Sequence, residues 1–271
     1  MHFCNHKTAF LIHYYTQNLA KKKNIYRSII ITVIILAVLS CSIYYINNYF
    51  NRPKFVRYEA FGIDIPVNYT MHGIDVSHHQ NSIDWTDVKA MQVKNIKIGF
   101  AFIKATEGLG RVDNKFRNNW LNAKKNFIPR GAYHFFISSK SGKAQAENFI
   151  ETVVLQKGDM PPVLDIETTN GASATDIQQR VKDWLVMIEK QYKVKPIIYT
   201  NVSFYKDFLG SKFDDYPLWI AHYLVKDKPL IERNWSFWQH NESGRVNGID
   251  AYVDFNVFNG DSTDFNKLLI K

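Results

Sequence analysis

Residues 161–167, PPVLDIE, form a short apolar run that ends in two acidic residues, Asp165 and Glu167. The run lies between two longer segments, 142–156 and 174–192, whose apolar residues recur at helical spacing. A buried strand between two helices is the repeat unit of parallel α/β folds. This stretch therefore predicts an α/β fold.

The same rhythm extends in both directions from this stretch. Eight strands are expected, at 72–77, 98–106, 130–136, 161–167, 195–200, 217–223, 235–240 and 252–258. Helical segments separate the first five strands, at 85–93, 114–126, 142–156 and 174–192, and a shorter one follows at 202–208. Only loops separate the last three strands. The pattern predicts a parallel sheet covered by helices and closed into an irregular TIM-like barrel.

Polar side chains collect where these strands end, and in a parallel barrel all such ends open into one crevice. Alternation along the fourth strand puts Val163, Asp165 and Glu167 on the inward face. Burial and a neighbouring like charge both favour the protonated form of a carboxyl group. Glycoside cleavage needs one protonated carboxyl and one ionised carboxylate. The pair Asp165 and Glu167 could supply both.

Several aromatic residues also sit near predicted strand ends. They are Tyr133, Phe135, Tyr199, Trp219, Tyr223 and Trp238. Such rings suit the apolar faces of sugars, but each ring taken alone is more typical of an ordinary packed core.

Seven segments together resemble the signature blocks of glycoside hydrolase family 25. They are GIDVSHHQ (73–80), FAFIKATEG (100–108), GAYHFF (131–136), PPVLDIE (161–167), PIIYTN (196–201), PLWIAHY (217–223) and VDFNVFNG (253–260). The resemblance implies a (β/α)5(β)3 barrel and hydrolysis of the β-1,4 bond between N-acetylmuramic acid and N-acetylglucosamine. Two positions depart from the family pattern, Asn81 and Val112.

Carried over by position, the resemblance makes Glu167 the proton donor and Asp165 the nucleophile or the carboxylate that assists the substrate's acetamido group. Asp75 and Asp254 match two further acidic positions. The residues expected to contact substrate are Tyr133, Tyr199, Lys104, Phe135, Trp219, Tyr223 and Gln239. No cofactor and no metal is implied.

Other interpretations remain open at this point. Asp165 and Glu167 could form a structural ion pair with Lys104. His134 could join the carboxylates in a divalent-metal site, as in a metal-dependent polysaccharide deacetylase. The chain could also be a catalytically silent module that binds peptidoglycan.

The charge of the chain is concentrated at its N-terminus. The formal net charge is +9, and residues 1–57 contain eight of the 34 Lys and Arg residues and no Asp or Glu. Subtracting those eight leaves 26 basic residues against 25 acidic ones. The folded part is thus nearly neutral, which argues against a nucleic-acid partner.

Residues 29–46 are 18 uncharged residues, the lower limit for a membrane-spanning helix. We expect a basic cytoplasmic segment at 1–27, a transmembrane anchor at 28–48, a linker at 49–69 and a monomeric catalytic barrel at 70–271 outside the cytoplasm. A cleaved signal peptide is the alternative. Both cysteines, Cys4 and Cys41, precede the barrel, so it can hold no disulfide.

Overall fold

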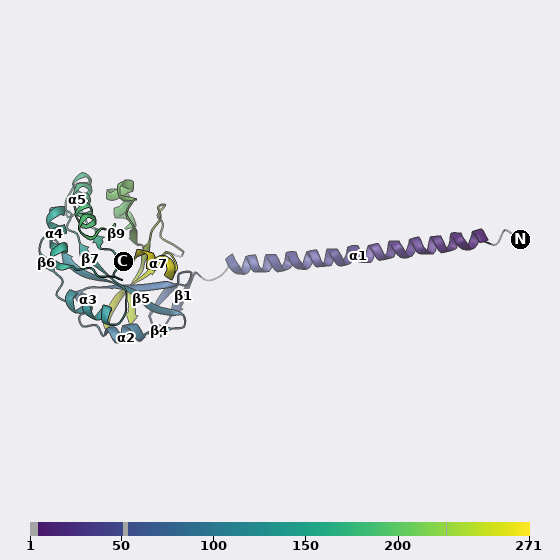
Figure 1. Ribbon diagram of the computed structural model, residues 1–271, viewed down its shortest axis with the longest axis horizontal. Helices are drawn as coiled ribbons and strands as arrows, with labels where there is room; N and C mark the ends of the chain where they lie inside the picture. The colour runs from purple at the N-terminus through teal and green to yellow at the C-terminus, as the bar shows by residue number, and fades with distance from the viewer. Residues whose placement is uncertain (1–4, 51–53, 226) are drawn as a thin grey trace. The chain divides into compact units, whose positions relative to one another are not determined.

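The computed structural model describes residues 5–50, 54–225 and 227–271 (Figure 1). The chain divides into two compact units, Met1–Pro53 and Lys54–Lys271. The alternating strands and helices predicted from the sequence lie in the second unit.

The first unit consists of one helix, α1 (Asn5–Phe50). Within it, Tyr26–Asn47 has a mean hydropathy of 2.6 over an 18-residue window and carries no buried residue in that window. Among the described residues it is the one helix that is long and apolar enough to cross a membrane. It overlaps the expected anchor at 28–48.

The second unit is a closed barrel of eight strands. The barrel strands are β3 (Met71–Val76), β5 (Ile96–Glu107), β7 (Arg130–Phe135), β8 (Val163–Asp165), β9 (Ile197–Asn201), β10 (Leu218–Ala221), β11 (Phe237–Val246) and β12 (Ile249–Phe258). Their order around the barrel is β3-β12-β11-β10-β9-β8-β7-β5, and pairing of β3 with β5 closes it. The predicted barrel is confirmed.

The last strand departs from the all-parallel prediction. β12 is antiparallel to both of its neighbours, β11 and β3. Asn247 and Gly248 join β11 to β12, and Gly248 has φ +83°. An Asn-Gly pair forms tight hairpin turns, which reverse the chain and force antiparallel pairing. The Asn-Gly pair is visible in the sequence, but the alternation of strands and helices does not by itself predict the direction of the last strand.

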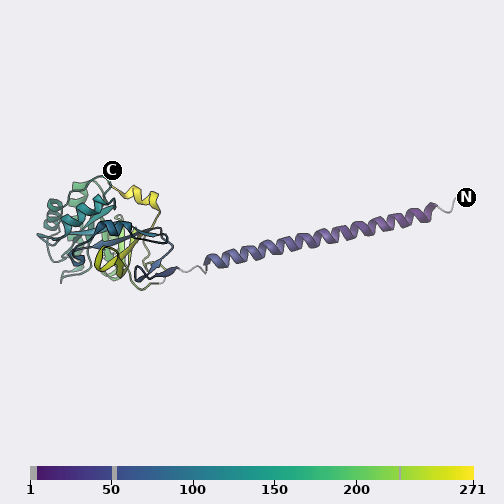
Figure 2. The same cartoon turned by 90° about the horizontal axis from the view of Figure 1, so that it is seen from below.

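Helices cover the barrel largely where they were expected (Figure 2). They are α2 (Trp85–Ala90), α3 (Phe116–Lys125), α4 (Gly142–Thr152), α5 (Ala174–Tyr192), α6 (Val202–Phe204) and α7 (Ser262–Leu268). Short 3-10 turns form η1 (His78–Gln80) and η3 (Gly210–Phe213), and η2 (Tyr205–Leu209) is a π-helical turn. Side-chain caps from Asp84, Ser141 and Ser173 begin α2, α4 and α5. The helix α7 was not anticipated.

The stretch expected as a linker contains a hairpin that belongs to the barrel unit. Strands β1 (Phe55–Tyr58) and β2 (Ile63–Pro66) pair with each other, and Phe61, Ile63 and Ile65 are buried in the main core. Apolar residues at alternating positions drive this packing. The compact unit therefore begins at Lys54. Two-residue strands β4 (Gln92–Val93) and β6 (Arg111–Val112) pair with β5.

The core separates into an outer layer under the helices and an inner layer within the barrel. Phe100, Phe102 and Phe237 fill the interior together with Phe265 of α7. A Cβ at Gly73 would lie 2.4 Å from the Phe100 ring, so glycine is required there for the ring to fit. These rings close the barrel beneath the ends of its strands.

Candidate active site

A cavity of about 300 Å³ opens at the carboxyl ends of the parallel strands. All eleven site residues expected from the sequence line it. They are Asp75, Lys104, Tyr133, Phe135, Asp165, Glu167, Tyr199, Trp219, Tyr223, Gln239 and Asp254. Because they come from eight different strands or strand ends, only the closed barrel brings them together.

Asp165 and Glu167 lie where β8 ends. Leu164 and Ile166 pack in the outer core, so the alternate residues face the cavity. Asp165 is only 7% exposed, and its buried Oδ1 has no hydrogen-bond partner. Burial, and then the charge of Glu167, raise the pKa of Asp165 well above its usual value. Burial, and then the charge of Asp75, also raise the pKa of Glu167.

The pair Asp75 and Asp254 lines the same cavity as Asp165 and Glu167. The two residues are directly opposite each other in the β3 and β12 ladder. Asp75 Oδ2 accepts hydrogen bonds from Gln239 Nε2 at 2.9 Å and from Asn256 Nδ2 at 2.7 Å. Burial, followed by the charge of Asp75, raises the pKa of Asp254 to about 9. Burial also raises the pKa of Asp75, against the hydrogen bonds that it accepts.

Gln239 joins this pair to two tyrosines. Its Oε1 accepts hydrogen bonds from the hydroxyls of Tyr199 and Tyr223. Since its Nε2 donates to Asp75, the side-chain amide is fixed in one orientation. Trp219 Nε1 donates to Asn256 Oδ1 at 2.8 Å, which orients the second donor to Asp75. The acids are thus held by a network in which each partner is itself anchored.

Comparisons with known proteins identify the family. The model of Glycosyl hydrolases family 25 matches residues 74–249, more than half of the chain. The chain belongs to this family. It is a glycoside hydrolase, and ten of the eleven site residues fall inside the matched stretch, with Asp254 beyond it.

Relatives and solved structures agree with this assignment. The chain is 46% identical to the Escherichia coli protein YegX over 216 residues, 80% of this chain and 78% of that one. It is 37% identical to Lysozyme M1 of Streptomyces globisporus over 206 residues, 70% and 68% of the two chains. A family 25 glycosyl hydrolase structure from Bacillus anthracis is 34% identical with a TM-score of 0.70, and 79% of this chain covers 100% of that one.

The basic residue of this family 25 site does not pair with the two acids of β8. Lys104 Nζ lies 2.7 Å from Glu107 Oε2, and the same nitrogen is 4.7 Å from the centre of the Phe135 ring. Glu107 also pairs with Arg111 at 2.6 Å. The interpretation that Lys104 forms a structural ion pair with Asp165 and Glu167 is therefore wrong. The positive charge of Lys104 nevertheless lowers the pKa of both acids.

The histidine needed for a metal-dependent deacetylase points away from the acids of this family 25 enzyme. His134 is buried on the outer face of β7, where its ring stacks against Trp184 of α5. Its ring nitrogens lie 2.7 Å from Thr106 Oγ1 and 3.2 Å from Gln145 Oε1. Because side chains alternate along a strand, His134 lies on the other face of β7 from Tyr133 and Phe135. It therefore cannot join Asp75, Asp165 and Glu167 in one coordination site.

Three residues that line the cavity were not anticipated as site residues. They are Ser77, His79 and Glu242. Glu242 follows Gln239 in a part of β11 where the register shifts repeatedly, so simple alternation does not show which way it faces. Its charge helps to raise the pKa of Asp254.

The two departures from the family pattern lie outside the cavity lining. Asn81 ends η1 with φ +54°, and Val112 is exposed on β6. Neither touches the acids.

Proposed function

We propose that this family 25 enzyme is an N-acetylmuramidase that hydrolyses the β-1,4 bond between N-acetylmuramic acid and N-acetylglucosamine in peptidoglycan. The observation that carries the proposal is the pair Asp165 and Glu167 at the cavity mouth, with an unpartnered carboxylate oxygen on Asp165. Two relatives are named lysozymes, one from Streptomyces globisporus and one from Clostridium acetobutylicum.

Glu167 acts as the general acid. Its raised pKa favours the protonated form, and the proton passes to the leaving glycosidic oxygen as the bond to the anomeric carbon breaks. Glu167 then accepts a proton from the water that attacks the anomeric carbon. The configuration at that carbon is retained, because two successive displacements restore it.

Asp165 stabilises the cationic transition state. Its free Oδ1 either bonds to the anomeric carbon or supports attack by the substrate's acetamide oxygen. The negative charge of Asp75 helps to raise the pKa of both Asp165 and Glu167, and Gln239 holds Asp75 in place.

The rings around the acids contact the sugars. Tyr133, Phe135 and Tyr223 are half-buried at the cavity wall, so one side of each remains open to a ligand. Tyr199 and Trp219 are buried in the floor and contact the sugar only at its deepest point.

The test is product analysis with purified peptidoglycan and the barrel unit, residues 54–271. A muramidase releases new reducing ends on muramic acid, and these become muramitol on borohydride reduction. Acetate release that stops in EDTA would favour a deacetylase instead. Binding to peptidoglycan without any new reducing ends would show that the barrel is a catalytically silent binding module.

We further propose that α1 anchors the enzyme in a membrane with its N-terminus in the cytoplasm and the barrel on the periplasmic or extracellular side. The basic residues before the apolar stretch support this orientation. In this arrangement residues 1–27 lie in the cytoplasm and residues 28–48 cross the bilayer. The enzyme is a monomer, and its partner is peptidoglycan.

A further inference from the structure

The two ends of the barrel differ in charge. Carboxylates collect at the end where strands lead into helices, which is the end with the cavity. Lysines collect at the opposite end, in or beside the connections that lead from helices into β5, β7, β8 and β9. We call the following exposed residues the lysine face: Lys94, Lys124, Lys125, Lys157, Lys193 and Lys195.

The positive charge of the lysine face is not compensated by carboxylates. None of its lysines forms an ion pair with an acidic side chain among the residues that the structure describes. The connections at 91–97, 124–130, 153–162 and 193–196 contain one acidic residue, Asp159, which is buried and paired with Arg130. The next connection, before β10, contains Asp214 and Asp215, and α7 and its N-cap at this end carry exposed Asp264 and Asp261, so the lysine face covers only one side of this end.

The lysine face is continuous across the neighbouring connections. Lys124 donates a hydrogen bond to Gln156 Oε1, which joins the end of α3 to the loop before β8. Tyr192 donates to the carbonyl of Val153 at 2.7 Å, which joins the end of α5 to the same loop. The lysines of the three connections before β7, β8 and β9 therefore lie on one surface and not on separate parts of the barrel.

Apolar side chains project from this surface among the lysines. Phe127 is 84% exposed and adopts φ +56° directly after α3. Its N–H bonds to Lys124 O and the following N–H bonds to Ala123 O, a helix ending that strongly favours glycine. An aromatic side chain that is both exposed and in a left-handed conformation does not help the fold.

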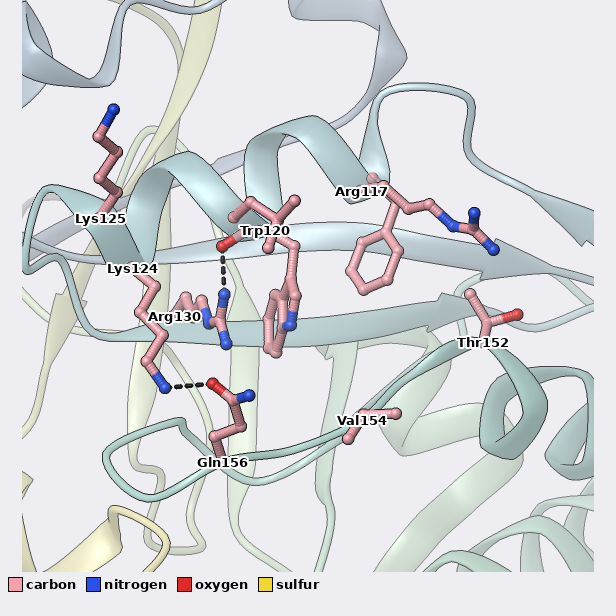
Figure 3. A pocket seen from close by; sticks show the side chains of 10 residues that line it. Arg117, Trp120, Lys124, Lys125, Arg130, Thr152, Val154 and Gln156 are labelled. Carbon is pink, nitrogen blue, oxygen red and sulfur yellow. Dashed lines mark hydrogen bonds between the residues drawn. The ribbon is translucent and has the colours of Figure 1, made fainter.

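An apolar groove of about 490 Å³, which Lys124 and Lys125 help to line, lies between α3 and the loop before β8 (Figure 3). Leu121 and Val154 are exposed on its walls, at 68% and 71%, and Trp120 forms its floor. Arg117, Lys124 and Lys125 surround the opening, and no acidic residue lines it. A groove of this kind fits a ligand with an apolar part and a negative charge.

We propose that the lysine face docks on an anionic lipid surface, with Phe127 and the groove inserted among the headgroups. Basic residues beside exposed aromatic and aliphatic side chains are typical of proteins that lie on such membranes. Only residues 51–53 separate α1 from the barrel unit, so a bilayer that holds α1 is within reach. Docking by this end turns the cavity away from the membrane.

The test measures co-sedimentation of residues 54–271 with lipid vesicles, without peptidoglycan, so it can fail while the muramidase assignment stands. A chain of this extent folds alone, since the solved Bacillus anthracis structure is covered completely by 79% of this chain. The vesicles are either pure phosphatidylcholine or contain one third phosphatidylglycerol. The variant carries Lys124→Gln, Lys125→Gln and Lys157→Gln, and the matched control carries Lys140→Gln, Lys143→Gln and Lys182→Gln.

We expect binding to the anionic vesicles only. Each lysine near an anionic surface strengthens binding roughly fivefold, so the triple variant binds at least tenfold more weakly and the control binds as the parent does. Equal binding to both vesicle types, no binding, or equal loss in the two triple variants would overturn the proposal. Purified anionic wall polymer is tested in place of the vesicles. If residues 54–271 sediment with that polymer, the polymer is the ligand of the lysine face, and this result would also overturn the proposal.

Phe127→Gly separates a role in docking from a role in folding. Glycine fits the left-handed conformation, so the melting temperature rises, while the lost ring weakens binding to the anionic vesicles. A variant with a lower melting temperature and unchanged vesicle binding would show that Phe127 serves the fold and would contradict its insertion.

Discussion

At the scale of single residues, the site depends on carboxyl groups whose proton affinity is set by their neighbours. Alternation along PPVLDIE already predicted that Asp165 and Glu167 share a face, because strand geometry is local. The contacts of these acids could not be predicted in the same way. That Gln239 links Asp75 to Tyr199 and Tyr223 depends on three strands far apart in sequence.

The pH dependence of Asp75→Asn tests this electrostatic account. The charge of Asp75 raises the pKa of Glu167, so removing it lowers that pKa. In the proposed mechanism Glu167 must be protonated to act, so we expect the alkaline limb of the kcat/KM profile to move to lower pH. Glu242→Gln is the control, because Glu242 lines the cavity but acts on Asp254. An alkaline limb that stays in place in Asp75→Asn would refute this coupling.

At the scale of elements, the first five strands and their helices followed from hydrophobic periodicity, and α5 was predicted with its observed bounds, Ala174–Tyr192. The direction of β12 depended instead on a two-residue turn, which periodicity does not detect. The hairpin of β1 and β2 was missed because its strands are four residues each, too short for a clear pattern.

Gly248→Ala tests the packing of the β11 and β12 hairpin on α2. A Cβ at Gly248 would lie 2.3 Å from the carbonyl oxygen of Asp84, which caps α2, and φ is +83°. We expect a loss of about 2–3 kcal/mol in the free energy of unfolding. Gly158→Ala is the control, since φ is +88° there with open space around it, and should cost about 1 kcal/mol. Equal losses in urea denaturation would show that the hairpin does not press on α2.

At the scale of the whole molecule, the chain combines an apolar helix with a family 25 barrel. If α1 remains in the mature protein, the full chain sediments with membranes and resists carbonate extraction, because a spanning helix is held by the hydrocarbon core. N-terminal sequencing checks the same point. A soluble product that begins after the apolar stretch would show that the segment is a cleaved signal.

The central claim is that the barrel hydrolyses peptidoglycan with Glu167 as its proton donor. The most direct measurement is the rate at which residues 54–271 clear a suspension of purified peptidoglycan, with Glu167→Gln beside the parent. Because the raised pKa of Glu167 means that its ionised form destabilises the fold at neutral pH, the Gln variant should melt at an equal or higher temperature. Its clearance rate should fall about 10²- to 10⁴-fold. A folded Gln variant that clears the suspension at the parent's rate would contradict the account.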